Sequence, residues 1–426
     1  MNSREIALRI LYEIEYNGAY SNMALKTALP CDLSRVDKSF ITQLVYGVTR
    51  YKLTLDYIIS KFSSVKLKKL SKYVLLILRM GIYQIKFMDK VPDSAAVNES
   101  VKLAKHYCGK SSGFVNAILH NVIKNIDNIA YPDEKIKRLS VQYSFPEDMV
   151  RMFENLSFCE ELLKALNEEP QTSIRINTLK GTDLEIDGAT IEKNPLYEFS
   201  RTISGVDIGN SKEYSDGLFT VQDVAATMAS LALSPNPGEV CIDVCSAPGG
   251  KTTHLAELME NKGEIFAFDL HEHKIDIINK NAERMGINII KAECHDSTLV
   301  KENLIEKADK VLVDAPCSGL GIIRRKPDIK WNKDDISELP KIQYKILKSA
   351  SRYLKKGGEL VYSTCTLNSL ENEGVILKFI NENPEFELVS IKLPSPLDRE
   401  NDGYITLYPN IDNTDGFFIS KIKRCK

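Results

Sequence analysis

The stretch Ile242-Asp-Val-Cys-Ser-Ala-Pro-Gly-Gly-Lys251 decides the fold of the second half of this chain. The apolar run over residues 240–244 is typical of a buried strand, and residues 252–259 carry the pattern of a helix. The Pro-Gly-Gly sequence between them fits a tight turn of the kind that binds nucleotides. This stretch therefore predicts a strand, a glycine-rich turn and a helix at the start of an α/β domain.

The same alternation continues toward the end of the chain. A helix pattern covers residues 274–285, and further strand patterns lie at residues 264–269, 289–292, 310–313 and 359–363. Such alternation predicts a doubly wound parallel sheet, which binds ligands at the carboxyl ends of its strands. Residues 416–420 are expected to add an antiparallel edge strand.

The turn matches neither of two known glycine-rich nucleotide-binding motifs. A Walker A loop would need a glycine where Cys245 stands, and the fingerprint Gly-x-Gly-x-x-Gly is absent from this stretch. Asp269 ends the next strand, twenty residues beyond Gly249, where a carboxylate accepts hydrogen bonds from ribose hydroxyls. Asp296 follows the third strand and is placed to face the base. Each carboxylate alone is more often a strand-end cap, but together they favour a nucleoside ligand.

Two cysteines follow strand patterns in the same way. Cys317 stands in Val311-Leu-Val-Asp-Ala-Pro-Cys-Ser-Gly319, and Cys365 stands in Leu360-Val-Tyr-Ser-Thr-Cys-Thr366. A free cysteine often fills a core, but a thiolate is a good nucleophile, and Asp314 at the same edge could exchange protons. The pair therefore indicates covalent chemistry beside a cofactor. The residues alone do not decide which cysteine attacks.

The 426 residues exceed the usual size of one hydrophobic core, and the patterns divide them into three predicted domains. Residues 1–140 read as an all-helical bundle, residues 141–235 as a small α+β domain of the RRM-like kind, and residues 236–426 as the α/β domain. A single helix is expected over residues 147–166. Residues 1–143 hold 22 lysines and arginines against 12 acidic residues, which favours a polyanionic partner for the first domain. A solvated helical surface is the alternative.

The composition limits the cellular compartment and the partners that we expect. The nine cysteines form no CxxC pair, so we expect neither a zinc site nor a disulfide framework. No signal peptide pattern and no apolar run long enough for a bilayer is present. We therefore expect a cytoplasmic protein without metal or membrane partners. Because no long exposed heptad pattern is present, we also expect a monomer.

Several motifs resemble those of RNA cytosine-C5 methyltransferases of the NOL1/NOP2/Sun type. The three most specific are Ala247-Pro-Gly-Gly-Lys251, Asp314-Ala-Pro-Cys-Ser-Gly319 and Ser363-Thr-Cys-Thr366. The resemblance extends to Val221-Gln-Asp223, Pro327-Asp-Ile-Lys-Trp331 and Asp415-Gly-Phe-Phe418. In the first domain, Asp37, Tyr46-Gly-Val48 and Gly113-Phe-Val-Asn-Ala-Ile-Leu119 are similar to the NusB-type helical domain fused to one bacterial branch of the family.

The resemblance implies a fold, a cofactor and a mechanism. It implies a NusB-like bundle, a small α+β domain and a Rossmann-like methyltransferase domain that uses S-adenosyl-L-methionine. Cys365 would attack carbon 6 of cytosine, Asp314 would protonate the ring nitrogen, and Cys317 would help release the product. The residues that would bind the cofactor are Cys245, Ser246, Ala247, Pro248, Gly249, Gly250, Lys251, Asp269, Asp296 and Asp314.

The implied substrate is 16S ribosomal RNA, either naked or at an early stage of assembly. The target base must leave its stack, which favours single-stranded or loop RNA. Five side chains are candidates for RNA contact: Arg175, Asn177, Arg324, Arg325 and Lys326; Trp331 would either stack on RNA or pack internally. Three alternatives remain at this point: a non-catalytic RNA-binding scaffold, a methyltransferase for another RNA, and a Rossmann-type enzyme acting on a small molecule or protein.

Overall fold

The computed structural model describes residues 2–30, 33–332 and 335–426. The chain divides into two compact units, which are described separately. The helical unit comprises Met1–Glu168 and the segment Ile323–Lys333, and the α/β unit comprises Glu169–Ile322 and Asp334–Lys426. The three-domain division with bounds at residues 140 and 235 stays a prediction.

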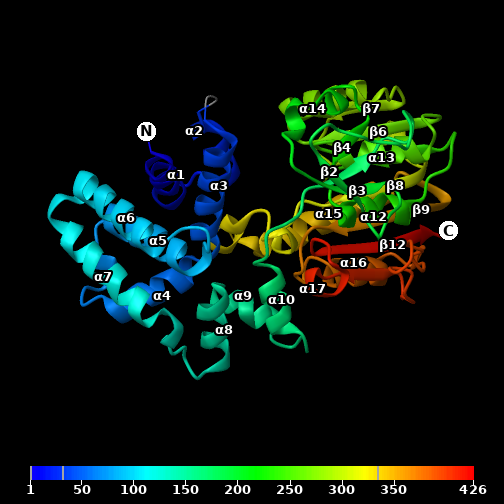
Figure 1. Ribbon diagram of the computed structural model, residues 1–426. Helices are drawn as coiled ribbons and strands as arrows, with labels where there is room; N and C mark the ends of the chain where they lie inside the picture. The colour runs from blue at the N-terminus through cyan, green and yellow to red at the C-terminus, as the bar shows by residue number, and fades with distance from the viewer. Residues whose placement is uncertain (1, 31–32, 333–334) are drawn as a thin grey trace. The chain divides into compact units, whose positions relative to one another are not determined.

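Amphipathic helices build the helical unit, in which α1, α3, α4, α6 and α7 pack against α5 (Figure 1). Each buries an apolar stripe because its leucines, isoleucines and valines recur at helical spacing. The first seven are α1 (Ser3–Asn17), α2 (Ser21–Ala28), α3 (Arg35–Arg50), α4 (Lys52–Phe62), α5 (Lys72–Phe87), α6 (Asp93–Cys108) and α7 (Ser112–Asn125). Three more follow: α8 (Lys135–Tyr143), α9 (Glu147–Phe153) and α10 (Cys159–Ala165).

Local chemistry explains where these helices begin and how closely they pack. The side chains of Asn2, Ser34 and Ser71 accept hydrogen bonds from backbone N–H groups in the first turns of α1, α3 and α5. A Cβ atom on Gly47 would lie 1.9 Å from Cζ of Tyr83, so α3 can approach α5 only with glycine there. The expected single helix over residues 147–166 is wrong, because turns at Glu154–Phe158 separate α9 from α10.

The α/β unit is built on an eight-stranded sheet with the order β10-β12-β9-β8-β5-β6-β7, in which β11 pairs with β12 (Figure 1). Neighbours from β9 to β7 are parallel, and β12 is antiparallel to β9 as predicted. The predicted edge position is wrong, because β10 and β11 also pair with β12 and place it inside the sheet. The strands are β5 (Val240–Asp243), β6 (Glu264–Asp269), β7 (Ile290–Cys294), β8 (Ala308–Asp314), β9 (Leu354–Thr364), β10 (Phe386–Leu388), β11 (Tyr404–Leu407) and β12 (Phe417–Arg424).

Strand order reverses between β5 and β8, and this point receives the predicted site residues. The chain runs from β5 outward through β6 and β7, then returns to place β8 on the other side of β5. Open α/β sheets bind their ligands at such a switch point. The principal helices are α12 (Val224–Leu233), α13 (Gly250–Leu258), α14 (Glu272–Met285), α15 (Leu339–Ser351) and α16 (Glu373–Glu382).

A second, antiparallel sheet precedes the large one in the same unit. Its order is β2-β3-β1-β4, formed by β1 (Ser173–Ile176), β2 (Thr190–Lys193), β3 (Ser200–Ser204) and β4 (Phe219–Val221). Arg175 on β1 lies completely buried and forms an ion pair with Glu257 of α13 at 2.6 Å. This pair links the small sheet to the helix that follows the glycine-rich turn.

Candidate active site

The two predicted cysteines meet at the carboxyl edge of the large sheet. Cys317 follows β8 and Cys365 follows β9, and since these strands are parallel neighbours, both thiols emerge at the same edge. Their Sγ atoms are 3.2 Å apart, and both cysteines are free thiols. The sequence placed each cysteine after a strand, and the strand pairing brings them into contact.

The environment of Cys317 keeps its proton in place. Its hydrogen bond with Cys365, followed by burial, raises the pKa of the Cys317 thiol well above the ordinary value. Cys317 is therefore protonated at neutral pH and can donate its hydrogen bond to Cys365. A thiolate at Cys365 would be stabilised by that donor.

Lys251 and Asp314 form an ion pair beside the thiols. Lys251 Nζ lies 2.7 Å from one carboxylate oxygen of Asp314, and the Ser363 hydroxyl donates to the other at 2.9 Å. Burial alone would lower the pKa of Lys251, but the Asp314 carboxylate and, to a smaller extent, Cys365 raise it above the ordinary lysine value. The pair thus places an ammonium group, a carboxylate and two thiols in one region.

The glycine-rich turn joins β5 to α13 as the sequence predicted. Gly249 has φ = 101°, a left-handed conformation that favours glycine, and its N–H donates to the Ser246 carbonyl at 2.7 Å. The Ser246 hydroxyl donates to the Phe268 carbonyl at 2.9 Å. No side-chain hydrogen bond caps the N-terminus of α13 within the described residues, and such a helix start suits the charged end of a small molecule.

Asp269 and Asp296 occupy different surroundings. Asp269, at the end of β6, accepts a hydrogen bond from the Ala247 N–H at 3.3 Å and pairs with Lys274 at 3.2 Å, so it lies directly beside the turn. Asp296 is exposed after β7, where the hydroxyl and N–H of Thr298 bind one carboxylate oxygen and lower its pKa. Carboxylates next to a glycine turn suit ribose hydroxyls, so this edge of the sheet fits a nucleoside cofactor.

The sequence reasoning missed Asp243, which ends β5 directly before the turn. Its side chain is 1% exposed, and one carboxylate oxygen accepts a 2.7 Å hydrogen bond from the Thr252 hydroxyl. Burial raises the pKa of Asp243 to about 7. The available signal was an acidic residue at the end of an apolar strand.

Comparison with known proteins identifies the family. Residues 230–423 match the family model described as 16S rRNA methyltransferase RsmB/F, and residues 1–124 match the NusB family. A Bacillus subtilis (strain 168) protein named "Probable ribosomal RNA small subunit methyltransferase B" is 36% identical over 442 residues, which cover 99% of this chain and 98% of the relative. The chain belongs to the ribosomal RNA small subunit methyltransferase B family.

Further relatives agree with this family. A Synechocystis sp. (strain PCC 6803) protein with the same name is 36% identical over the full length of both chains. The crystal structure of a methyltransferase homologue from Pyrococcus horikoshii is 29% identical and matches with a TM-score of 0.59, covering 69% of this chain and all of the other. Membership in the methyltransferase B family confirms the predicted fold class and an rRNA methyltransferase that uses S-adenosyl-L-methionine.

The described residues contain neither a membrane-spanning helix nor a cluster of metal ligands. None of the helices within the described residues is long and apolar enough to cross a membrane. Over the same described ranges, no three histidine, cysteine, aspartate or glutamate side chains are grouped so that they could hold a metal ion.

Several residues predicted to contact RNA in this methyltransferase B family member are buried instead. Arg175 and Asn177 are 0% exposed; Arg175 pairs with Glu257, and Asn177 donates to the carbonyls of Gly217 and Met285. Arg324 is also buried, and the expectation that these three side chains contact RNA is therefore wrong. Arg325 is half-buried and Lys326 is exposed. Trp331 packs internally, and its indole N–H donates to the Thr49 carbonyl at 2.7 Å.

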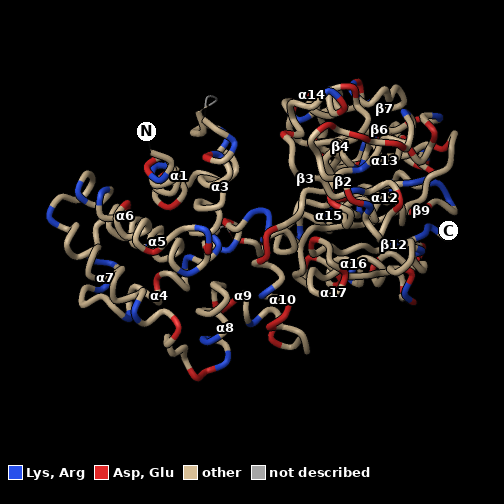
Figure 2. The backbone as a smooth tube through the Cα atoms, viewed as in Figure 1, with Lys and Arg blue, Asp and Glu red and all other residues tan. Residues whose placement is uncertain are grey.

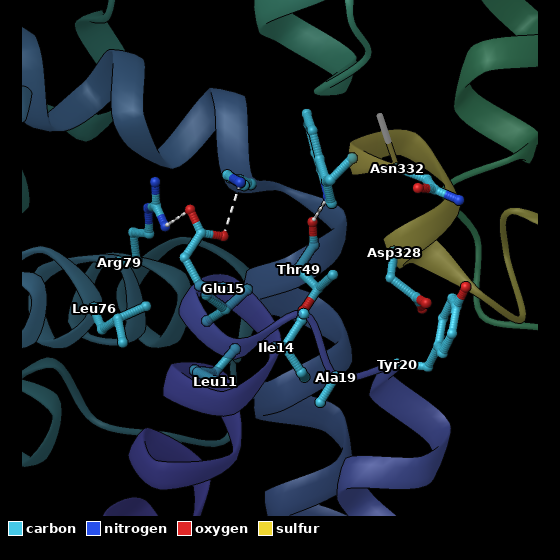
Figure 3. Close-up of a pocket in the computed structure, with 14 residues that line it drawn as sticks. Leu11, Ile14, Glu15, Ala19, Tyr20, Thr49, Leu76, Arg79, Asp328 and Asn332 are labelled. Atoms are coloured by element: carbon cyan, nitrogen blue, oxygen red, sulfur yellow. Dashed lines mark hydrogen bonds and ion pairs between the residues drawn. The ribbon is translucent and has the colours of Figure 1, made fainter. Parts of the chain in front are cut away.

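A cavity of about 250 Å³ lies within the helical unit (Figure 3). Its lining includes Leu11, Ile14 and Glu15 of α1, Thr49 of α3, and Trp331. Within the cavity wall, Glu15 pairs with Lys52 at 2.7 Å and with Arg79 at 3.4 Å. None of the predicted catalytic or cofactor residues lines it, so this cavity is separate from the thiol site.

Proposed function

We propose that this enzyme methylates carbon 5 of a cytosine in 16S ribosomal RNA through a covalent bond between Cys365 and carbon 6. The observation that carries the proposal is the 3.2 Å approach of two free thiols next to the Lys251–Asp314 ion pair. Carbon 5 of cytosine is a poor nucleophile, and a thiolate bound to carbon 6 turns the ring into an enamine that is reactive at carbon 5.

Asp314 and Lys251 suit the addition step. As the Cys365 thiolate bonds to carbon 6, the ring nitrogen takes up a proton, which Asp314 can relay from the Lys251 ammonium 2.7 Å away. S-adenosyl-L-methionine, when bound, supplies the methyl group. The open glycine turn with Asp269 beside it suits that cofactor, and we assign its binding to residues 245–251, Asp269, Asp296 and Asp314.

Cys317 suits the release step because its acidity depends on Cys365. The first cause of its raised pKa is the hydrogen bond with Cys365, and this cause disappears when Cys365 becomes a thioether. Cys317 can then lose its proton to solvent and, as a thiolate, accept the proton from carbon 5. The electrons of that C–H bond re-form the ring double bond and expel the Cys365 thiolate, and the ring nitrogen returns its proton through Asp314 to Lys251.

Two alanine variants test these roles. With S-adenosyl-L-methionine and 16S rRNA, Cys317→Ala is expected to accumulate a protein–RNA adduct on denaturing gels, because its release step fails. Cys365→Ala is expected to form no adduct and to lower the methylation rate by at least about 10⁴-fold. An adduct from Cys365→Ala and none from Cys317→Ala would exchange the roles, and continued methylation by both variants would reject the mechanism.

The helical unit supplies the expected RNA-binding surface. Figure 2 shows lysines and arginines along its helices, and Lys66, Lys68, Lys69 and Lys72 are exposed. Arg79 of α5 is 4% exposed and pairs with Asp56 at 2.7 Å, so it does not contribute to this surface. We infer that the surface binds phosphates of naked or early-assembly 16S rRNA.

The substrate assignment is tested on cellular RNA. Bisulfite sequencing of 16S rRNA from a strain lacking the gene should show one cytosine that has lost its methyl group. Purified enzyme should then methylate deproteinised rRNA from that strain faster than intact small subunits. A full set of 16S methylcytosines in the strain would reject 16S rRNA as the substrate. We also propose that the enzyme acts as a monomer in the cytoplasm.

A further inference from the structure

Glu371 is a completely buried carboxylate that the reaction scheme above does not use. It precedes α16 and is 0% exposed. Oε1 accepts hydrogen bonds from Ser318 Oγ at 2.6 Å and Asn368 Nδ2 at 3.0 Å, and Oε2 accepts from Ser318 N and Gln343 Nε2, both at 2.9 Å. A buried carboxylate is costly unless such donors surround it, so these four bonds fix its position closely.

The donors to Glu371 come from both cysteine loops and from Gln343 of α15. Ser318 directly follows Cys317, and Asn368 lies in the loop that begins at Cys365. The Ser318 hydroxyl also lies 2.7 Å from the hydroxyl of Thr366, the residue after Cys365. Gln343 donates a second hydrogen bond, at 2.9 Å, to the carbonyl of Pro316, the residue before Cys317. One carboxylate therefore joins the residues that flank the two thiols.

We propose that Glu371 is the positioning residue that sets the spacing of the Cys317 and Cys365 thiols. Backbone hydrogen bonds, such as the one from Gly321 N–H to the Cys365 carbonyl at 2.9 Å, also link the two loops. The hydrogen bonds of Glu371 hold the loops together on the side next to the sulfurs. Its hydrogen bonds come from Ser318, Asn368 and Gln343 and not from either sulfur, so it positions the sulfurs through these neighbours, while its charge also raises the pKa of Cys317. The importance of this spacing for catalysis rests on the proposed function; the spacing itself does not.

The substitution Glu371→Gln tests this role with little change in shape. All four partners donate to the carboxylate, so the NH₂ group of a glutamine would face donors and force the two loops apart. Glu373→Gln is the matched control, since Glu373 is a half-buried glutamate of the same segment with no bond to either cysteine loop among the described contacts. Circular dichroism establishes that both variants are folded.

The direct readout is the equilibrium between the thiol pair and glutathione, measured by mass spectrometry in the full-length protein without RNA or cofactor. Two protein thiols and one oxidised glutathione give one Cys317–Cys365 disulfide and two reduced glutathiones, so the constant measures the effective concentration of the thiols. Glu371→Gln is expected to lower this constant at least about 10-fold, and Glu373→Gln to change it less than about 2-fold. An unchanged constant in Glu371→Gln overturns the proposal.

Kinetics then separate positioning from general damage. Glu371→Gln is expected to lower kcat by about 10²-fold while KM for RNA and for S-adenosyl-L-methionine stays within about 3-fold. Equal loss through KM would overturn the positioning role. If Glu371→Gln does not fold, Ser318→Ala decides the question: it removes the bond at 2.6 Å and should lower the glutathione constant about 3-fold, and an unchanged value rejects the proposal.

These outcomes stay distinct from those of the proposed function. A lowered glutathione constant in Glu371→Gln, together with no adduct in either cysteine variant, would support the positioning role of Glu371 and reject the covalent mechanism. An unchanged constant with a Cys317→Ala adduct would do the reverse.

Discussion

Each unit of this enzyme encloses a charged side chain, and the two charges have different partners. In the α/β unit, Glu371 is 0% exposed and accepts three hydrogen bonds from the loops that carry the thiols and a fourth from Gln343 of α15. In the helical unit, Lys330 is 1% exposed and donates to the carbonyls of Arg50 and Ser144, at 3.1 Å each, and to the Asn167 side chain at 2.6 Å.

The partners explain what each charge does. Arg50 and Ser144 lie at the C-terminal ends of α3 and α8, where carbonyl oxygens point outward and favour a cation. The Phe145 ring adds a cation–π contact at 3.7 Å. Lys330 thus ties helix ends together, whereas Glu371 ties reactive loops together. A buried charge therefore serves stability or chemistry according to the segments to which its hydrogen-bond partners belong.

The largest expected effect belongs to the charges beside the thiols. Asp314→Asn removes the carboxylate that pairs with Lys251, and with it the proposed proton relay, so kcat should fall by about 10²–10⁴-fold. Because Asp314 is partly exposed, the free energy of unfolding should change by less than about 1 kcal/mol. Steady-state methylation and urea unfolding measure both. A large loss of stability would show that the Lys251–Asp314 pair, like Lys330, mainly stabilises the fold.

Asp243 should make the stability of the α/β unit depend on pH. Its folded pKa is about 7, above the ordinary value of 3.8, so the folded state holds a proton that the unfolded state releases between those values. Stability from this group is present below pH 4 and is lost as the pH rises to 7, by up to about 4 kcal/mol. Asp243→Asn should lose this dependence. Urea unfolding of the wild type and of Asp243→Asn at several pH values measures this difference. If the free energy of unfolding of both proteins changes with pH in the same way, Asp243 is not the group responsible.

Lys330 should show the opposite pH dependence, in the other unit. Burial, and then the charge of Arg50, lower the pKa of Lys330 well below the ordinary value, so the unfolded state binds the extra proton. This contribution to stability therefore rises as the pH increases from the folded pKa toward the ordinary lysine value. Lys330→Met removes that dependence and leaves three oxygens without a donor, which should cost about 3 kcal/mol.

Trp331 makes the Lys330 prediction measurable. It is the single tryptophan of the chain and lies in the helical unit, so its fluorescence reports the unfolding of that unit. Lys326→Met, at an exposed position of the same segment, is the control and should change stability by less than about 0.5 kcal/mol. Equal effects of the two substitutions would show that burial of Lys330 contributes nothing.

The smallest effect concerns packing without charge. Gly47→Ala would place a methyl group 1.9 Å from the Tyr83 ring, where α3 packs on α5, and should cost about 1–3 kcal/mol through displacement of the helices. Gly113→Ala, on α7 with open space around it, is the control and should be neutral or slightly stabilising. Thermal unfolding followed by Trp331 fluorescence distinguishes the two.

The positions of the parallel strands and the glycine-rich turn were predictable because they depend on local patterns. Apolar runs and the Pro-Gly-Gly turn predicted the parallel sheet, and the placement of Cys317 and Cys365 after strands predicted a shared edge. The helical unit followed from 3.6-residue periodicity. The break between α9 and α10 was missed, since residues 154–158 contain neither glycine nor proline to mark it.

The hydrogen-bond partners of polar side chains were not predictable from local patterns. Arg175, Asn177 and Arg324 look like RNA ligands in the sequence, yet the fold buries all three. Burial of a polar side chain depends on donors and acceptors that arrive from distant segments, as Glu257 does for Arg175. Local patterns in the sequence were enough to predict the family, the parallel sheet and the edge at which the thiols lie. The roles of the two buried charges became visible only in the tertiary structure. Glu371 binds the residues beside the thiols and Lys330 binds the ends of helices, because long-range packing brings these partners together.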